Sequence, residues 1–175
     1  MKNYINSAFI FIVMITSITS YAQSMRPAKT QKSQLNFTAQ LTSDIAFQLV
    51  EQVRKAANAA GKEVTVAIVD VAGQTIVVSK GDGIGPHNTE AARRKAFTSA
   101  STKTATLKLD RDAKANSDMQ NLANLPELLL LGGGVPLYYK DQLIGAVGVA
   151  GGGGAQADDA FAKAAVLPEY NISTK

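Results

Sequence analysis

Residues 81–98 read GDGIGPHNTEAARRKAFT, and this stretch changes from a turn into a helix. Its first five residues include three glycines, which let the backbone fold sharply or approach another chain segment closely. Pro86 suits the start of a helix because it has no N–H to leave unpaired. We expect Asn88 or Thr89 to cap the helix and the helix to run as far as Leu109.

One face of this helix carries small side chains at every fourth position, namely Ala92, Ala96 and Ala100. A face of this kind can lie very close to a β-sheet. His87 is the only histidine of the chain and stands at the mouth of the preceding loop. We therefore look for function where the loop meets the helix.

The flanking segments alternate between helix and strand patterns. Apolar or alternating residues predict a central strand at 64–70, its hairpin partner at 74–80, an edge strand at 136–140 and a last strand at 143–150. Glycines in the last strand would let a helix or a ligand approach the sheet closely. Helices are expected from residue 41 to Gly61 and at 156–165, and residues 110–124 are expected to form a shorter helix or an ordered surface loop. This order predicts an α+β fold with a largely antiparallel sheet, which has five strands only if 128–131 is also a strand.

The N-terminus has the features of a secretory signal peptide. Lys2 supplies a positive charge, residues 5–18 are almost all apolar or small, and Ser20 and Ala22 are small residues suited to cleavage after Ala22. The apolar run is too short for a membrane anchor. We therefore expect residues 1–22 to be removed and the protein to be periplasmic or extracellular. Residues 23–40 would form a flexible segment, 41–167 the folded domain and 168–175 a frayed tail.

The composition removes several classes of function. The chain has no cysteine, so it forms no disulfide and offers no thiolate for a metal or for nucleophilic catalysis. Its formal net charge of +4 comes from scattered basic residues, which does not predict nucleic-acid binding. A single histidine and the lack of a G-x-S-x-G motif leave hydrolase and zinc sites without their usual parts. No set of residues specifies a reaction, so we do not predict an enzyme.

Three motifs occur in order along the chain. They are GDGxGP followed by ExAxRKAFT within 81–98, LGGGVP at 131–136 and IGAVGVAG at 144–151. Together they resemble the GlcG/HbpS family of haem-binding proteins, from about residue 41 to residue 167. The resemblance implies a profilin-like fold, with a five-stranded sheet and helices on its faces. It also implies haem as the cofactor and assembly into homo-oligomers.

Five residues are candidates for a haem site. An imidazole is a good axial ligand for haem iron, which makes His87 the candidate metal ligand, and Tyr138 could supply a phenolate instead. The resemblance ties residues 94–98 to haem binding, with Thr98 at the position of a hydroxyl group and with Arg94 and Lys95 suited to the haem propionates. His87 lies in a variable part of the motif, so its role is not implied by the family, and a solvated loop histidine is the alternative.

The sequence thus predicts an exported haem- or tetrapyrrole-binding protein, acting in haem handling or sensing and forming a homo-oligomer. The alternative is a non-haem oligomeric accessory module whose loop binds a small acid or a partner protein.

Overall fold

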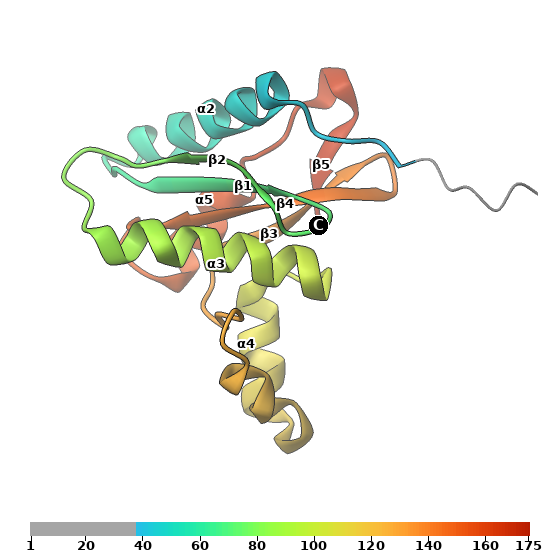
Figure 1. The fold of residues 1–175 in the computed structure, drawn as a ribbon. Coiled ribbons are helices and arrows are strands. Elements are labelled where there is room, and N and C mark those ends of the chain that lie inside the picture. The colour runs from blue at the N-terminus through green and yellow to red at the C-terminus, as the bar shows by residue number, and fades with distance from the viewer. Residues whose placement is uncertain (1–37) are drawn as a thin grey trace, which may run out of the picture. The chain divides into compact units, whose positions relative to one another are not determined.

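The computed structural model describes residues 38–175, so the predicted signal peptide and nearly all of the predicted flexible segment lie outside the described residues. Figure 1 shows the arrangement of the helices and strands. In chain order they are α2 (Ser43–Ala59), β1 (Thr65–Asp70), β2 (Thr75–Ser79), α3 (Pro86–Thr102), α4 (Thr106–Ala115), the 3-10 helix η1 (Ser117–Asn124), β3 (Gly134–Tyr139), β4 (Gln142–Ala150), α5 (Ala155–Ala162), the 3-10 helix η2 (Pro168–Tyr170) and β5 (Ile172–Thr174).

The strands form one five-stranded sheet in the order β2-β1-β4-β3-β5, and every neighbouring pair is antiparallel. This confirms the predicted α+β, profilin-like fold and the hairpin between β1 and β2. Among residues 38–175, no helix is both long and apolar enough to cross a membrane.

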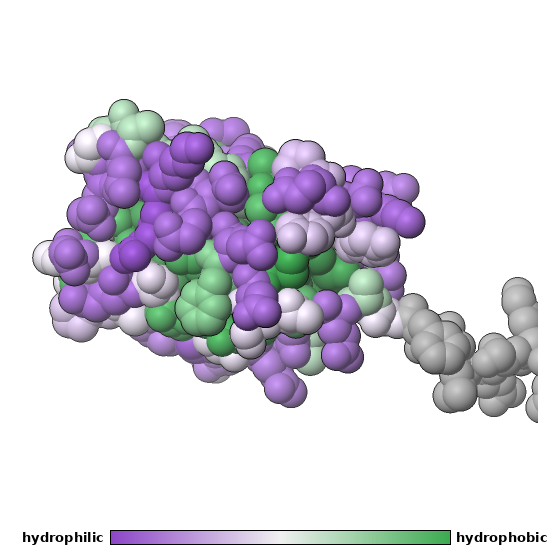
Figure 2. Space-filling view, turned by 90° about the horizontal axis from the view of Figure 1, so that it is seen from above, coloured by the Kyte–Doolittle hydropathy of each residue, from purple (hydrophilic) through white to green (hydrophobic). Residues whose placement is uncertain are grey.

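Helices cover both faces of the sheet (Figure 1). On one face, apolar residues of α2, led by Leu49 and Val53, pack on the sheet in a cluster that includes Val66 and Val147. Thr42 caps α2, since its hydroxyl accepts a hydrogen bond from the Ile45 N–H. Figure 2, which views the molecule from the side of α2, shows a mainly hydrophilic outer surface with hydrophobic groups between the polar ones. The helix is therefore amphipathic, with its apolar side on the core.

On the other face, α3 lies directly against β4 and β1. Ala92, Ala96 and Ala100 are all buried in a cluster with small residues of these two strands. A Cβ atom at Gly148 would overlap the backbone of Ala92, and one at Gly134 would overlap the backbone of Lys95. The prediction that small helix residues and strand glycines allow a close approach is confirmed.

The predicted limits of the long helix are wrong at both ends. Gly85 is the residue before the first helical position, which Pro86 occupies, so Asn88 and Thr89 lie inside the first turn and are not caps. The helix ends at Thr102 because Lys103 has a left-handed backbone, with φ of 54°. The chain then turns and starts α4, which is why one continuous helix to Leu109 does not form.

The fifth strand also differs from the prediction. Residues 128–131 form no strand, and β5 lies instead within the segment predicted to be a frayed tail. Ile172 is buried, and β5 pairs with β3, so β3 is an inner strand and not the predicted edge strand. The tail interpretation is wrong because these last residues complete the sheet.

Candidate functional site

A cavity of about 460 Å³ lies where the first turns of α3 face the loop that joins β4 to α5. His87 stands at its rim with an exposed side chain, as expected for the first turn of a helix that follows a loop. Lys95 lies two turns further along α3 and is buried in the cavity wall, as is Asp158 from α5. The structure thus brings two of the predicted site residues, His87 and Lys95, to one cavity.

The loop opposite α3 consists of four consecutive glycines, residues 151–154. Gly151, Gly153 and Gly154 have φ values of 102°, 105° and 139°, a region that side chains disfavour, so glycine is needed here. These glycines line the cavity together with Ala91 and the 44% exposed side chain of Leu131. The cavity wall on this side therefore consists of backbone and apolar groups and carries few charged side chains.

Lys95 and Asp158 form a buried ion pair that supports this loop. The ammonium of Lys95, whose side chain is 1% exposed, lies 2.8 Å from Asp158 Oδ2 and donates a second hydrogen bond of 2.9 Å to Val149 O. Asp158 Oδ1 accepts a hydrogen bond of 2.7 Å from the Gly152 N–H. Burial lowers the pKa of the Lys95 ammonium, and Asp158 opposes that shift. The ammonium predicted to hold a propionate is therefore engaged inside the protein.

Lys62 lies beside the glycine loop and was not among the predicted site residues. Its Nζ is 3.8 Å from the position that a Cβ atom of Gly153 would take, and the side chain is exposed. No ion pair of Lys62 is found within residues 38–175. Lys62 does not line the cavity and is one of several lysines scattered along the chain, so only the fold places it beside the glycine loop.

Arg94 and Thr98 point to a different segment, the chain between η1 and β3. Arg94 Nη2 donates hydrogen bonds of 2.8 Å to Pro126 O and 2.7 Å to Leu128 O. The hydroxyl of Thr98, which is fully buried, donates to Arg94 O at 2.7 Å and accepts from the Leu129 N–H at 2.8 Å. These two residues hold the segment that leads to Leu131, so they act on the cavity through its wall.

Tyr138 lies away from this cavity and is not among its lining residues. It pairs with Ser173 in the β3–β5 ladder, and Lys175 Nζ lies 4.6 Å from the centre of its ring. Within the described chain, no cluster of three or more histidine, aspartate or glutamate side chains could hold a metal ion.

Comparisons with known proteins agree on one family. The family model of haem degrading protein HbpS-like matches residues 41–167. A double variant of HbpS from Streptomyces reticuli is 34% identical, with a TM-score of 0.69 over 79% of this chain and 93% of that one.

Two more distant relatives extend this comparison. The solved complex of PduOC with haem is 27% identical, with a TM-score of 0.69 over 78% of this chain and 99% of that chain. An uncharacterized 15.0 kDa protein from the dhaT-dhaS intergenic region of Citrobacter freundii is 25% identical over 116 residues, which are 65% of this chain and 82% of its own length.

Proposed function

This chain belongs to the HbpS-like family, and we propose on that basis that it binds haem in the cavity at the start of α3. The observation that carries the proposal is the place of His87, an exposed imidazole at the rim of a cavity of about 460 Å³. A relative of the same fold, PduOC, has been solved as a complex with haem. The family and this relative support a haem-related function.

The residues around the cavity fit a tetrapyrrole in three respects. The imidazole of His87 can bind iron through nitrogen. The glycine loop, Ala91 and Leu131 offer a low, partly apolar wall against which a flat macrocycle can pack. The ammonium of Lys62, which lies beside Gly153 and outside the lining of the cavity, can pair with a carboxylate of a ligand that extends past the loop.

Each group would have a separate role when haem is bound. Haem would supply the iron chemistry, while His87 would hold the metal and Lys62 would orient the macrocycle by one of its carboxylates. Leu131 would shield the apolar edge from water. Lys95 and Asp158 would keep the glycine loop in place, and Arg94 and Thr98 would keep the segment before Leu131 in place.

A haemin titration of the protein without residues 1–22 tests this proposal. We expect the Soret absorbance to change with added haemin and to saturate at one haemin per chain. An absorbance that keeps rising in proportion to haemin, with no saturation, would contradict haem binding. It would favour the alternative function, a non-haem accessory module.

We also propose that the protein is exported and forms a homo-oligomer. Export is supported by the charged, apolar and small-residue regions of residues 1–22. N-terminal sequencing of the protein from the periplasmic or culture fraction should give Gln23 as the first residue. Size-exclusion chromatography with light scattering should give a mass that is a multiple of the chain mass, and a monomer would contradict assembly. A role in haem handling or sensing is part of the same proposal.

A further inference from the structure

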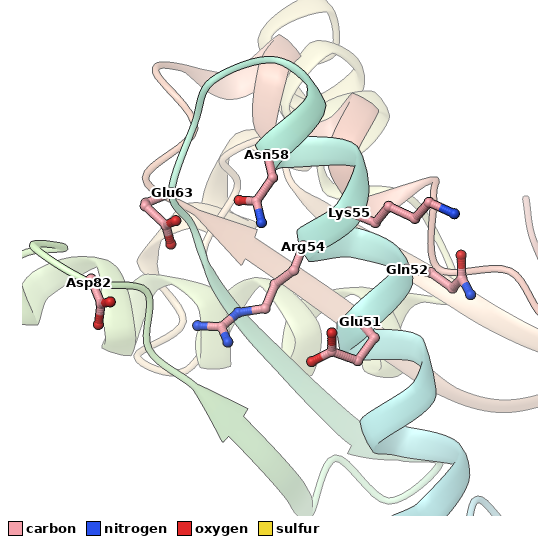
Figure 3. Close-up of a pocket in the computed structure, with 7 residues that line it drawn as sticks. All are labelled: Glu51, Gln52, Arg54, Lys55, Asn58, Glu63 and Asp82. Carbon is pink, nitrogen blue, oxygen red and sulfur yellow. The ribbon is translucent and has the colours of Figure 1, made fainter.

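A second cavity, of about 520 Å³, lies at the C-terminal half of α2 (Figure 3). It is bounded by α2, by Glu63 just before β1 and by Asp82 just after β2. Glu63 Oε2 lies beside Gly81, so the two loops that carry these carboxylates are neighbours. None of these residues takes part in the cavity beside His87.

The charges around this cavity are mixed. The guanidinium of Arg54 points into the space on whose far side Glu63 and Asp82 lie (Figure 3). Glu51 adds a third carboxylate from one turn earlier in α2, whereas the side chain of Lys55 points away from Arg54 (Figure 3). The cavity is therefore lined by three carboxylates and by two cations, Arg54 and Lys55, which leaves an excess of negative charge.

The guanidinium of Arg54 has few hydrogen-bond partners within the protein. Its Nη2 donates one hydrogen bond, of 3.2 Å, to Lys80 O. Its Nε is buried and has no hydrogen-bond partner. Within residues 38–175, Arg54 forms no ion pair with Glu51, Glu63 or Asp82, although all four line the same cavity. Buried N–H groups usually have an acceptor, and a guanidinium binds a carboxylate well, so Arg54 can still take a carboxylate partner from a ligand.

We propose that this cavity binds a small basic amino acid. Its carboxylate would bind to the guanidinium of Arg54, and its amino groups would lie against the carboxylates of Glu63 and Asp82. A ligand with a carboxylate alone would meet the negative charge of the acids, and a ligand with an amine alone would leave the guanidinium of Arg54 without a carboxylate partner. A molecule with both groups and a net positive charge satisfies both sides of the cavity.

Calorimetric titration with three related compounds tests the chemistry of the ligand. L-lysine carries both groups, cadaverine is lysine without its carboxylate, and hexanoate has a carboxylate without an amine. We expect saturable binding of L-lysine. The affinity for each of the other two compounds should be lower by at least about tenfold, the loss that follows from removing one charged hydrogen bond. Equal affinity for cadaverine and lysine, or no saturable binding of lysine, would overturn the proposal.

Variants test the place of the site. Arg54→Gln and Glu63→Gln should each weaken L-lysine binding by about tenfold, again the loss of one charged hydrogen bond. Asp44→Asn is the matched control, because Asp44 is an exposed carboxylate on the same helix and does not line the cavity, so lysine binding should be unchanged. Glu63 is exposed, so Glu63→Gln remains informative if Arg54→Gln fails to fold. Unchanged lysine binding in Glu63→Gln, or a loss in Asp44→Asn equal to that in Glu63→Gln, would overturn the proposed site.

The haemin titration of the same variants separates this inference from the proposed function. We expect haemin binding to be unaffected in Glu63→Gln, because that carboxylate does not line the cavity beside His87. If haemin does not bind, the conclusion on lysine binding is unaffected. If lysine does not bind, the conclusion on haem binding is unaffected.

Discussion

Lys95 Nζ lies 2.8 Å from Asp158 Oδ2, and this buried contact joins α3 to α5 behind the glycine loop. The same ammonium donates to Val149 O at the end of β4, and the second oxygen of Asp158 accepts from the Gly152 N–H. This one ion pair therefore connects α3, α5, the end of β4 and the glycine loop. The shape of the cavity beside His87 depends on this pair.

Replacing Lys95 by methionine should destabilise the protein strongly. The substitution keeps an unbranched side chain but leaves the carboxylate of Asp158 buried without its cation. Removing one partner of a buried ion pair typically costs about 3–5 kcal/mol. The free energy of unfolding of Lys95→Met, measured by urea denaturation, should fall by that amount.

The double variant Lys95→Met/Asp158→Leu is the control for this measurement. It removes both charges, so no carboxylate is left buried alone, and much of the lost stability should return. If the double variant is as unstable as Lys95→Met, or less stable, the lost charge partner does not explain the effect.

The contribution of Lys95 to stability should depend on pH in the alkaline range. Burial lowers the pKa of its ammonium below the ordinary value of 10.5, with Asp158 opposing the shift. The unfolded chain then binds this proton more tightly, so the free energy of unfolding rises as the pH increases through the folded-state pKa towards 10.5. Urea denaturation over this range should show the advantage of the wild type over Lys95→Met growing with pH. An advantage that shrinks would contradict the direction of the shift.

Gly148→Ala should destabilise the contact between α3 and β4. A Cβ atom there would overlap the backbone of Ala92, and backbone atoms cannot move aside as a flexible side chain can. We expect a cost near the upper end of overpacking, about 3 kcal/mol. Gly85→Ala is the control, because its Cβ would meet only the ring of His87, and loss of a glycine before the helix costs under about 1 kcal/mol. Similar denaturation midpoints for the two variants would contradict the close approach.

Thr98→Val should loosen the segment between η1 and β3. Valine has nearly the same shape but cannot accept the hydrogen bond from the Leu129 N–H, and an unpaired buried N–H costs about 1–3 kcal/mol. Hydrogen exchange at Leu129 should become faster, while Thr98→Ser, which keeps the hydroxyl, should stay close to the wild type. Unchanged exchange in Thr98→Val would show that this hydroxyl does not hold the segment.

Local patterns predicted much of the fold. The alanine face at Ala92 and Ala96 and the glycine at 148 indicated a helix pressed on the sheet, and this packing is found. Patterns of this kind record periodicity and side-chain size within one segment. They missed β5, which has only three residues and forms because β3 offers it an edge. They also missed the end of α3, since neither glycine nor proline marks it.

The residues of the candidate site were harder to predict from the sequence than the fold was. Asp158 lies in the first turn of a helix, where the helix dipole alone would favour a carboxylate, but its ion-pair partner, Lys95, lies 63 positions earlier in the chain. No pattern in the sequence pointed to Lys62. Such contacts depend on how the sheet brings distant loops together, which no single segment encodes.

The most direct test of this account compares haemin binding by His87→Ala and by Tyr138→Phe. Tyr138 is the matched control because it lies outside the cavity that His87 lines. We predict that His87→Ala weakens haemin binding by at least about tenfold, equivalent to about 1.4 kcal/mol, and alters the Soret spectrum, while Tyr138→Phe does neither. Wild-type affinity and spectrum in His87→Ala would contradict the claim that haem binds at the start of α3.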